Sequence, residues 1–338
     1  MTSPTSSPWV ARPERTATSR QPESTRSGAR IAICTPTYQR PANLTELLES
    51  IKAMDRAGLD VHLFVVDNDA ERSAEPVVAA VMRDAGIPVD YDCEPVRSLP
   101  VVRNRLVERA AMVDPDWIWF LDDDQFVEPD ALQLMVTTAE QYNADCVVGR
   151  VPHTFEGSTS PWAHWSGIFD EVHRPTGEPT GAFGSNGPLV RFSALQHVEG
   201  PFDPRLGLTG GEDSLFFTRF HDLGFRSIGC DEAVIWDRLH ASRNTPRWLT
   251  QRALRFGLVK GFLVREVSPS PLKTVKWLAI GGGYMTLNGL AAAVMLPFGP
   301  RRYFRYWIKA ARGYGILVGT LFPGRILGIR EYATIHGH

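Results

Sequence analysis

Three consecutive carboxylates, Asp122, Asp123 and Asp124, follow the apolar run 117–121 and form a cluster that could bind a metal ion. Like charges this close together are costly unless a cation lies among them. Oxygen ligands favour Mg²⁺ or Mn²⁺, which commonly bind through one or two carboxylates and the phosphates of a substrate. A cation held in this way offsets the charge of a diphosphate leaving group. A solvated acidic turn explains the same residues, so the triplet alone leaves the function open.

A second acidic pair, Glu212 and Asp213, follows two glycines at positions 210 and 211. The glycines allow the backbone to approach a substrate closely. A carboxylate that accepts a proton in a transition state typically accelerates the reaction about 10²- to 10⁴-fold. The acids also suit the first turn of a helix, where negative charge interacts favourably with the helix dipole. The two roles are compatible, and both remain open from the residues alone.

Strands that alternate with helices must position these groups. Apolar runs predict strands at 31–34, 61–66, 89–91 and 117–121. Apolar residues at helical spacing predict one helix that follows Pro41 and two more that cover 76–85 and 101–112. This alternation predicts an α/β fold with a mostly parallel sheet covered by helices on both faces.

Ligands bind beyond the carboxyl ends of the strands in such sheets. Thr35 and Thr37 follow the first expected strand, Asp67 and Asp69 follow the second, and the acidic triplet follows the fourth. We therefore expect one site at this edge of the sheet.

Five motifs resemble family 2 glycosyltransferases in order and approximate spacing, over about residues 30–256: CTPTYQRP at 34–41, VVDND at 65–69, Arg103-Asn104, FLDDD at 120–124 and GGED at 210–213. The closest likeness is to bacterial polysaccharide glucosyltransferases of the succinoglycan type. The resemblance implies a GT-A fold, which is a single Rossmann-like unit. It also implies inverting transfer of a sugar from a nucleotide-sugar donor, typically UDP-linked, with Mg²⁺ or Mn²⁺ as cofactor.

The resemblance also implies roles for individual residues. Asp213 is the expected general base, and Asp124 and His240 are the expected metal ligands. The expected nucleotide-sugar contacts are Thr35, Pro36, Tyr38, Asp67, Arg103 and Asp122. From the residues alone, the favoured roles are different: Asp67 as a turn residue, Arg103 as a solvated position on a helix face, and His240 as a structural histidine.

The acceptor is expected to be a saccharide or a lipid-linked saccharide. Its candidate contacts are Trp162, Trp165 and Glu212, although tryptophans are more often buried than stacked on a sugar. Processive synthases of the superfamily carry a QxxRW motif, whereas this chain reads QRALRF at 251–256. The arginine is one place late and the tryptophan is absent, which favours addition of a single sugar.

The C-terminal region has a different character. Residues 277–300 contain no charged side chain and are long enough to cross a bilayer, but several glycines weaken their hydropathy. From 299 to 330 every charged residue is basic, which suits an anionic membrane surface. A helical cap packed on the main domain is the alternative. We expect a disordered tail at 1–29, a catalytic domain at 30–258 and a helical, membrane-associated region at 259–338.

The composition of the chain excludes some classes of protein function. A net charge of −2 argues against a nucleic-acid binder, and four dispersed cysteines without a CxxC pair suit reduced thiols and give no support to a zinc site. Reduced thiols suit the cytosol, and the apolar and basic C-terminal region suits a membrane, so we expect the protein at the cytoplasmic face of the cell membrane. A nucleotidyltransferase is one alternative, but residues 35–41 lack the glycine-rich loop that it needs. A carbohydrate- or lipid-binding pseudoenzyme is another, but both acidic motifs are complete.

Overall fold

A nine-stranded sheet forms the centre of the protein. The computed structural model describes residues 28–328 apart from 158, 182–186, 208 and 268, so the tail expected at 1–29 lies almost wholly outside the described residues. The strand order is β3-β2-β1-β4-β8-β6-β9-β5, with β7 paired to β9. The first four strands are all parallel and match the expected ones: β1 (Arg30–Thr37), β2 (Asp60–Asp67), β3 (Val89–Cys93) and β4 (Trp117–Phe120).

The second half of the sheet is mixed. β8 (Leu189–Arg191) runs antiparallel to both β4 and β6 (Cys146–Arg150), and so joins the parallel half to the rest. The long strand β9 (Ser227–Leu239) pairs in parallel with β6 and β7 (His153–Phe155) and antiparallel with β5 (Gln125–Val127). The expected α/β architecture is confirmed, with antiparallel pairs added around β8 and β5.

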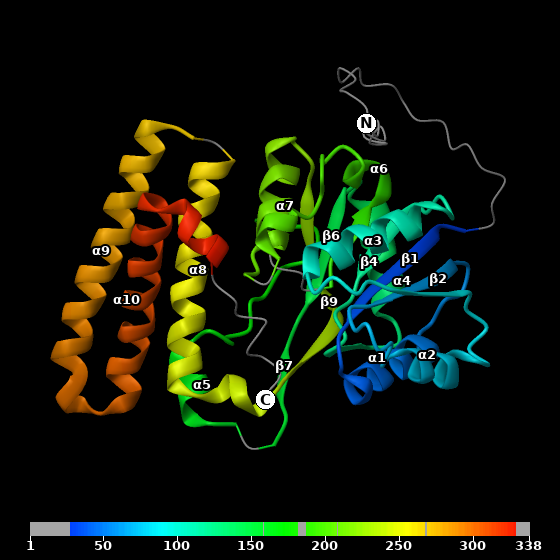
Figure 1. Cartoon of the computed structure of the whole chain (residues 1–338), viewed down its shortest axis with the longest axis horizontal. Helices are drawn as coiled ribbons and strands as arrows, with labels where there is room; N and C mark the ends of the chain where they lie inside the picture. The colour runs from blue at the N-terminus through cyan, green and yellow to red at the C-terminus, as the bar shows by residue number, and fades with distance from the viewer. Residues whose placement is uncertain (1–27, 158, 182–186, 208, 268, 329–338) are drawn as a thin grey trace.

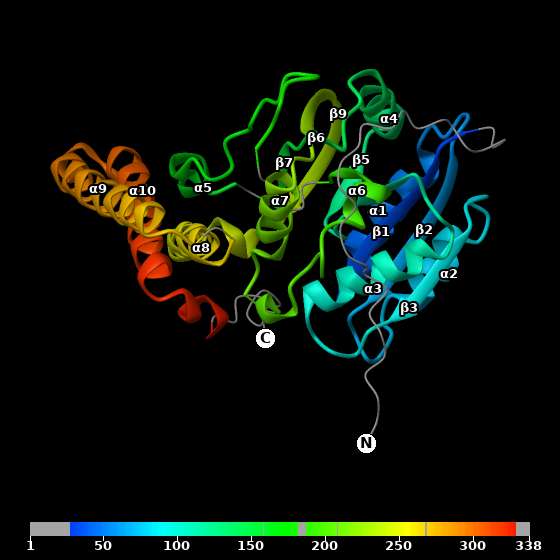
Figure 2. The same cartoon turned by 90° about the horizontal axis from the view of Figure 1, so that it is seen from above.

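Helices cover both faces of the sheet because successive strand side chains point to opposite sides. Ile31 and Ile33 of β1 pack in one core, whereas Ala32 and Cys34 pack in the other. The first core includes residues of α1 (Pro41–Ala53), α2 (Glu75–Met82) and α4 (Ala131–Gln141). The second includes residues of α3 (Leu99–Ala111), α6 (Phe192–Leu195) and α7 (Glu212–Asp222). Figure 2 shows the helices on both sides of the sheet.

Three long helices stand beside the sheet and form the helical region expected at the C-terminus (Figure 1): α8 (Pro246–Glu266), α9 (Pro271–Met295) and α10 (Pro300–Leu321). α10 packs between α8 and α9. The boundary expected after residue 258 falls inside α8, so a single helix belongs both to the catalytic domain and to this region.

Glycines let these helices approach each other closely. A Cβ atom built on Gly257 of α8 lies 2.1 Å from the carbonyl oxygen of Arg312 in α10, and one built on Gly315 lies 2.1 Å from the carbonyl oxygen of Leu254. Gly313 makes a similarly tight approach to the backbone of α9, with 2.5 Å to the amide nitrogen of Met285. Small residues at helix interfaces serve this purpose, because only they allow backbones to meet.

The contact between α8 and α10 yields a stability prediction. The substitution Gly315→Ala places a methyl group against the backbone of α8, and overpacking of this kind typically costs about 1–3 kcal/mol. We expect a decrease of that size in the free energy of unfolding measured by denaturant titration. Gly282→Ala in α9 is the matched control, because nothing lies within 4 Å of its added Cβ and alanine favours helix. Equal stability of the two variants would contradict the packing described for α8 and α10.

Candidate active site

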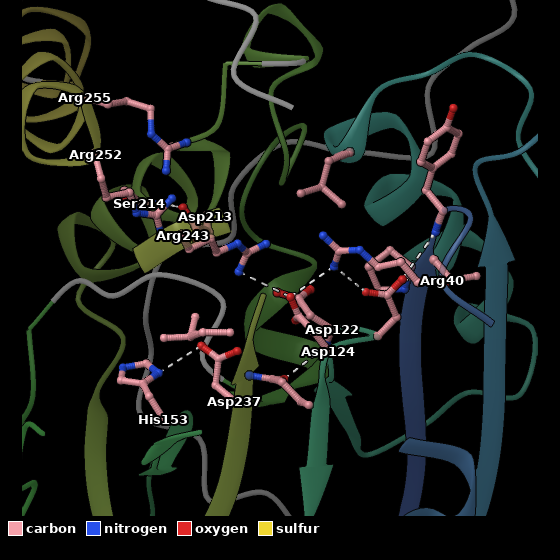
Figure 3. A pocket seen from close by; sticks show the side chains of 18 of the residues that line it. Arg40, Asp122, Asp124, His153, Asp213, Ser214, Asp237, Arg243, Arg252 and Arg255 are labelled. Atoms are coloured by element: carbon pink, nitrogen blue, oxygen red, sulfur yellow. Dashed lines mark hydrogen bonds and ion pairs between the residues drawn. The ribbon is translucent and has the colours of Figure 1, made fainter. Parts of the chain in front are cut away.

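One cavity of about 370 Å³ opens beyond the carboxyl ends of β1 and β4, and α8 forms part of its wall (Figure 3). Its lining combines carboxylates with guanidinium groups and aromatic rings. The acidic residues in the lining are Asp122, Asp123, Asp124, Asp213 and Asp237. The basic ones are Arg40, Arg97, Arg243, Arg252 and Arg255, and the aromatic ones include Tyr38, Phe169, Trp248 and Phe256.

The three carboxylates of the triplet have different surroundings. Asp123 is buried and accepts hydrogen bonds from the Thr37 hydroxyl at 2.9 Å and from Arg40 at 3.0 Å. Asp122 is the most exposed of the three and accepts a 2.9 Å bond from Arg103. Asp123 therefore fixes the loop after β4, whereas Asp122 presents its carboxylate to the cavity.

Asp124 is contacted by two arginines and is influenced by the charges of Asp123 and Asp237. Its Oδ2 atom is 3.0 Å from Arg40 and 3.5 Å from Arg243. Burial and the nearby charge of Asp237 nevertheless raise the pKa of Asp124 to about 7, against the opposing effect of the two arginines. Burial and a nearby like charge disfavour the ionised form of a carboxylate, and a bound cation would stabilise it.

Asp237 reaches the triplet because of the register of β9. Gln125, the first residue of β5, pairs with Asp237, and the amide of Arg238 donates to the carbonyl oxygen of Asp124 at 2.8 Å. His153 of β7 is also opposite Asp237 and holds its carboxylate, with 3.1 Å between Nδ1 and Oδ2. Figure 3 shows this pair beside Asp122 and Asp124.

The carboxylates of Asp124 and Asp237 could supply part of the coordination shell of a hard divalent cation. Asp124 and Asp237 supply oxygen ligands, and ions such as Mg²⁺ ordinarily complete their shell with substrate phosphates and water. Among the described residues, no group of three or more His, Cys, Asp or Glu side chains is placed to hold a metal ion by itself. A cation at this position would need further ligands, such as substrate phosphates or water.

Asp213 faces the triplet from the start of α7. The chain enters this helix through Gly210 and Gly211, whose φ angles of 75° and 100° favour glycine. A Cβ atom on Gly211 lies 2.8 Å from the Val259 side chain of α8, so a larger residue would also push α8 away. This entry places Asp213 in the cavity wall as the second residue of the helix.

Glu212 and Arg103 form a buried pair behind the cavity. Arg103 donates to Glu212 at 2.7 Å and to Asp122 at 2.9 Å, and its side chain is only 2% exposed. Burial and the charge of Asp213 raise the pKa of Glu212 to about 7, while Arg103 acts in the opposite direction. Neither Glu212 nor Arg103 lines the main cavity. Arg103 thus bridges Asp122, in the loop after β4, and Glu212 of α7; the acceptor contact expected of Glu212 and the nucleotide contact expected of Arg103 stay predictions.

Other nucleotide contacts expected from the sequence divide into two groups. Pro36, Tyr38 and Asp122 line the cavity. Thr35 is fully buried, and Asp67 is fully buried with its carboxylate accepting bonds from the amide of Ala74 at 2.8 Å and the hydroxyl of Tyr91 at 3.0 Å. Neither Thr35 nor Asp67 is part of the lining, in which Asn68 appears instead.

His240 and the two tryptophans do not reach the cavity lining. His240 follows the end of β9, is 60% exposed, and bonds the Ser242 hydroxyl at 2.8 Å. Trp162 and Trp165 of α5 (Pro161–Ser166) pack instead with Phe304 of α10, with 4.9 Å between the rings of Trp162 and Phe304. The aromatic rings that do face the cavity from this side are Phe169 and Trp248, stacked at 6.1 Å.

Several functional positions were missed in the sequence. Asp237 and the arginines Arg40, Arg243, Arg252 and Arg255 all line the cavity. Arg40 lies inside the first motif, CTPTYQRP, so the resemblance could have marked it as a site residue. Arg252 and Arg255 lie in the 251–256 segment that departs from QxxRW, and their i, i+3 spacing places them on one face of α8.

The buried bridge yields a second prediction. The substitution Glu212→Leu leaves Arg103 buried with one carboxylate fewer, and removal of one partner from a buried ion pair typically costs about 3–5 kcal/mol. We expect a loss of that order in the free energy of unfolding. Arg109→Ala, which breaks the partly exposed pair with Asp90, is the control and should cost less than about 1 kcal/mol. A similar small loss in both variants would show that Arg103 is not held as described.

Comparison with known proteins identifies the family. Residues 32–198 match the family described as Glycosyl transferase family 2. The chain is 31% identical over 306 residues to the succinoglycan biosynthesis protein ExoM of Rhizobium meliloti (strain 1021), which covers 89% of this chain and 93% of that protein. It is 28% identical over 107 residues to the abequosyltransferase RfbV of Salmonella typhimurium, which covers 32% of each chain.

Solved structures share the fold at low identity. The mannosyltransferase PcManGT from Pyrobaculum calidifontis, in complex with GDP-Man and Mn²⁺, has a TM-score of 0.59 and 17% identity, with 88% of each chain covered. Residues 1–349 of S. aureus TarS, in complex with UDP-GlcNAc, have a TM-score of 0.50 and 15% identity, with 87% of this chain and 92% of that chain covered. Together, the matched family, the extent of the likeness to ExoM and the shared fold establish that this chain belongs to glycosyltransferase family 2 and is a glycosyltransferase.

Proposed function

We propose that the protein transfers a single sugar, with inversion, from a UDP-linked donor to a saccharide or lipid-linked saccharide acceptor, and that the reaction depends on a divalent cation. The observation that carries this proposal is the position of Asp213 across one cavity from Asp122 and Asp124. One relative by fold is in complex with UDP-GlcNAc and another with GDP-Man and Mn²⁺, which supports a nucleotide sugar and a metal.

The donor is held between β1 and α8. Tyr38 carries the Arg97 guanidinium 4.5 Å above its ring, and this stacked pair offers a flat wall for the base. Asp122 accepts from the ribose hydroxyls. Arg243 and Arg252 supply guanidinium groups for the diphosphate, because their planar donors match phosphate oxygens in pairs.

Asp124 and Asp237 are the proposed protein ligands of the divalent cation, with Asp237 in the place expected for His240. When bound, the ion neutralises charge that develops on the departing diphosphate. His153 holds the Asp237 carboxylate in position through its ring nitrogen. Arg40 and Arg243 already contact Asp124, so they limit the excess of negative charge before the cation and donor arrive.

Asp213 is the proposed general base. Its carboxylate accepts the proton of the acceptor hydroxyl as the acceptor oxygen forms a bond to the anomeric carbon. The bond from that carbon to the diphosphate oxygen breaks, and the nucleoside diphosphate leaves with the electron pair. A single displacement of this kind inverts the anomeric centre. Glu212 is unsuited to the role because it is buried against Arg103.

We place the reaction at the cytoplasmic face of a membrane. The described residues contain one helical segment, Pro271–Phe298, that is long and apolar enough to cross a bilayer by length and composition alone. The basic residues of α10 add attraction to anionic lipids. Trp248 and Phe169, which line the same cavity as Asp213, are the proposed acceptor contacts in place of Trp162 and Trp165.

The base yields a third prediction. Asp213→Asn removes the proton acceptor but preserves shape, so we expect kcat to fall by about 10²- to 10⁴-fold while the donor Kd stays nearly unchanged. Transfer is followed by release of nucleoside diphosphate, and donor binding by calorimetry. Asp222→Asn, the same change at an exposed acid of α7, is the control and should leave both values intact. Comparable turnover by Asp213→Asn would exclude Asp213 as the base.

The metal ligands yield a fourth prediction. In the presence of UDP, Asp124→Asn and Asp237→Asn should each weaken Mn²⁺ binding by at least about tenfold, whereas His240→Ala should bind as the unmodified protein does. The measurement is the free Mn²⁺ signal in electron paramagnetic resonance. Weakened binding in His240→Ala, together with unchanged binding in Asp237→Asn, would restore the histidine expected from the sequence.

A further inference from the structure

The outer face of α9 is an apolar surface without a partner among the described residues. Large side chains on it are strongly exposed: Leu272 at 80%, Leu287 at 69%, Leu290 at 67% and Val294 at 62%. At 100° per residue these four positions fall on one side of the helix, together with Ala279 and Gly283. Lys276 lies on the same side near the start of the helix, and from Trp277 onward the helix carries no charged residue. Single exposed apolar residues are ordinary, but an apolar face of this length indicates an interaction surface.

The opposite face of α9 is fixed against α10. Gly281 and Ala292 are its buried residues, and a Cβ atom on Gly281 lies 3.1 Å from the amide nitrogen of Leu317. α10 is fixed in turn against α8 through the close glycine contacts at 257 and 315. α9 therefore cannot move away from the domain without breaking a tightly packed three-helix layer (Figure 2).

The charged residues of α9 and α10 themselves are all basic, although Arg305 pairs with Asp170 of another segment at 3.1 Å. Between Glu266 and Glu331 the sequence contains no acidic residue. Lys273 and Lys276 lie in the first turns of α9, and Arg301, Arg302 and Arg305 follow its other end at the start of α10. Two copies of such a surface repel each other, whereas an anionic lipid surface attracts both ends of the helix.

Crossing the bilayer is incompatible with these observations. Because α9 is packed along α10, a crossing would carry α10 and α8 into the hydrocarbon, with Lys309, Arg312 and Lys260 on them. It would also place Arg301, Arg302 and Arg305 on the far side of the membrane. Loops rich in basic residues are retained on the cytoplasmic side.

We infer that α9 lies in the plane of an anionic bilayer, with its outer face inserted at the boundary of headgroups and acyl chains and both of its ends on the same leaflet. This inference rests on the membrane association proposed above and specifies its surface and orientation. Interfacial helices bind in this way through an apolar face and flanking basic residues. α8, whose other side lines the cavity, is then held at a fixed height above the lipid through α10.

Vesicle flotation of the full chain tests the surface. We expect the protein to float with vesicles of phosphatidylcholine and phosphatidylglycerol, and to bind vesicles of phosphatidylcholine alone at least tenfold more weakly. The double variant Leu287→Asp, Leu290→Asp should lose at least tenfold in binding to the anionic vesicles. Met112→Asp, which adds an acid at an equally exposed apolar residue at the end of α3, is the control and should float normally.

Labelling with a membrane-impermeant maleimide tests the orientation. In a Cys93→Ser background, Ser270→Cys and Arg302→Cys mark the two ends of α9, and Leu290→Cys marks its outer face. With the protein bound to sealed vesicles, both end positions should react from outside and Leu290→Cys should be protected. Protection of Arg302→Cys until detergent is added would overturn the in-plane orientation and indicate a crossing helix.

The failures are distinguishable. Absence of binding to any vesicle would refute membrane association itself, and concentration-dependent self-association in sedimentation would then assign the face to a second copy. Neither result would bear on sugar transfer, which is measured with soluble donor and without vesicles. Binding that the Leu287→Asp, Leu290→Asp variant retains would refute α9 as the docking surface while membrane association stands.

Discussion

The compensation of buried negative charge is the constraint on which the site depends. Five aspartates line one cavity and Glu212 is buried just behind it. Burial of unpaired carboxylates is costly, so each must meet a cation or take up a proton. Arg40 is shared between Asp123 and Asp124, and Arg103 is shared between Asp122 and Glu212. The arginines thereby link the ends of β1 and β4, which are neighbours in the sheet, to α3 and α7 of the second core.

The helices beyond the sheet extend this arrangement. α8 supplies Arg252 and Arg255 to the cavity on one side and glycine contacts to α10 on the other. Its position also depends on Gly211, where a larger residue would strike Val259. The entry to α7, the placement of Asp213 and the packing of the C-terminal helices are thus parts of one structure. The boundary expected after residue 258 falls within α8, which contacts both parts.

The sequence predicted the parts of the fold that depend on local pattern. Apolar runs and helical spacing located the first four strands and three helices. Of the residues expected together at the strand ends, Thr37 and the acidic triplet line one cavity, whereas Thr35, Asp67 and Asp69 do not. Arg103 could not be placed, because its burial depends on Glu212, 109 residues away. The packing of Trp162 and Trp165 could not be predicted for a similar reason, since their neighbours come from α10.

In β9, the alternation of side chains along a strand could have identified one further residue of the cavity. Side chains two residues apart in a strand share a face. Asp237 and Leu239 both line the cavity, whereas His240 lies past the end of the strand, so the alternation favours Asp237 as the residue directed at the triplet. The proposed metal site follows from that choice and from the pairing of β9 with β5, which brings Asp237 beside Asp124.

The most direct test of the central claim is release of nucleoside diphosphate from a panel of UDP- and GDP-linked sugars, measured with Mn²⁺ and with excess EDTA. The cavity described here predicts turnover of at least one UDP-linked donor with Mn²⁺, and loss of that turnover in EDTA. Turnover that is undiminished in EDTA, or failure to bind and turn over any nucleotide sugar, would contradict the account.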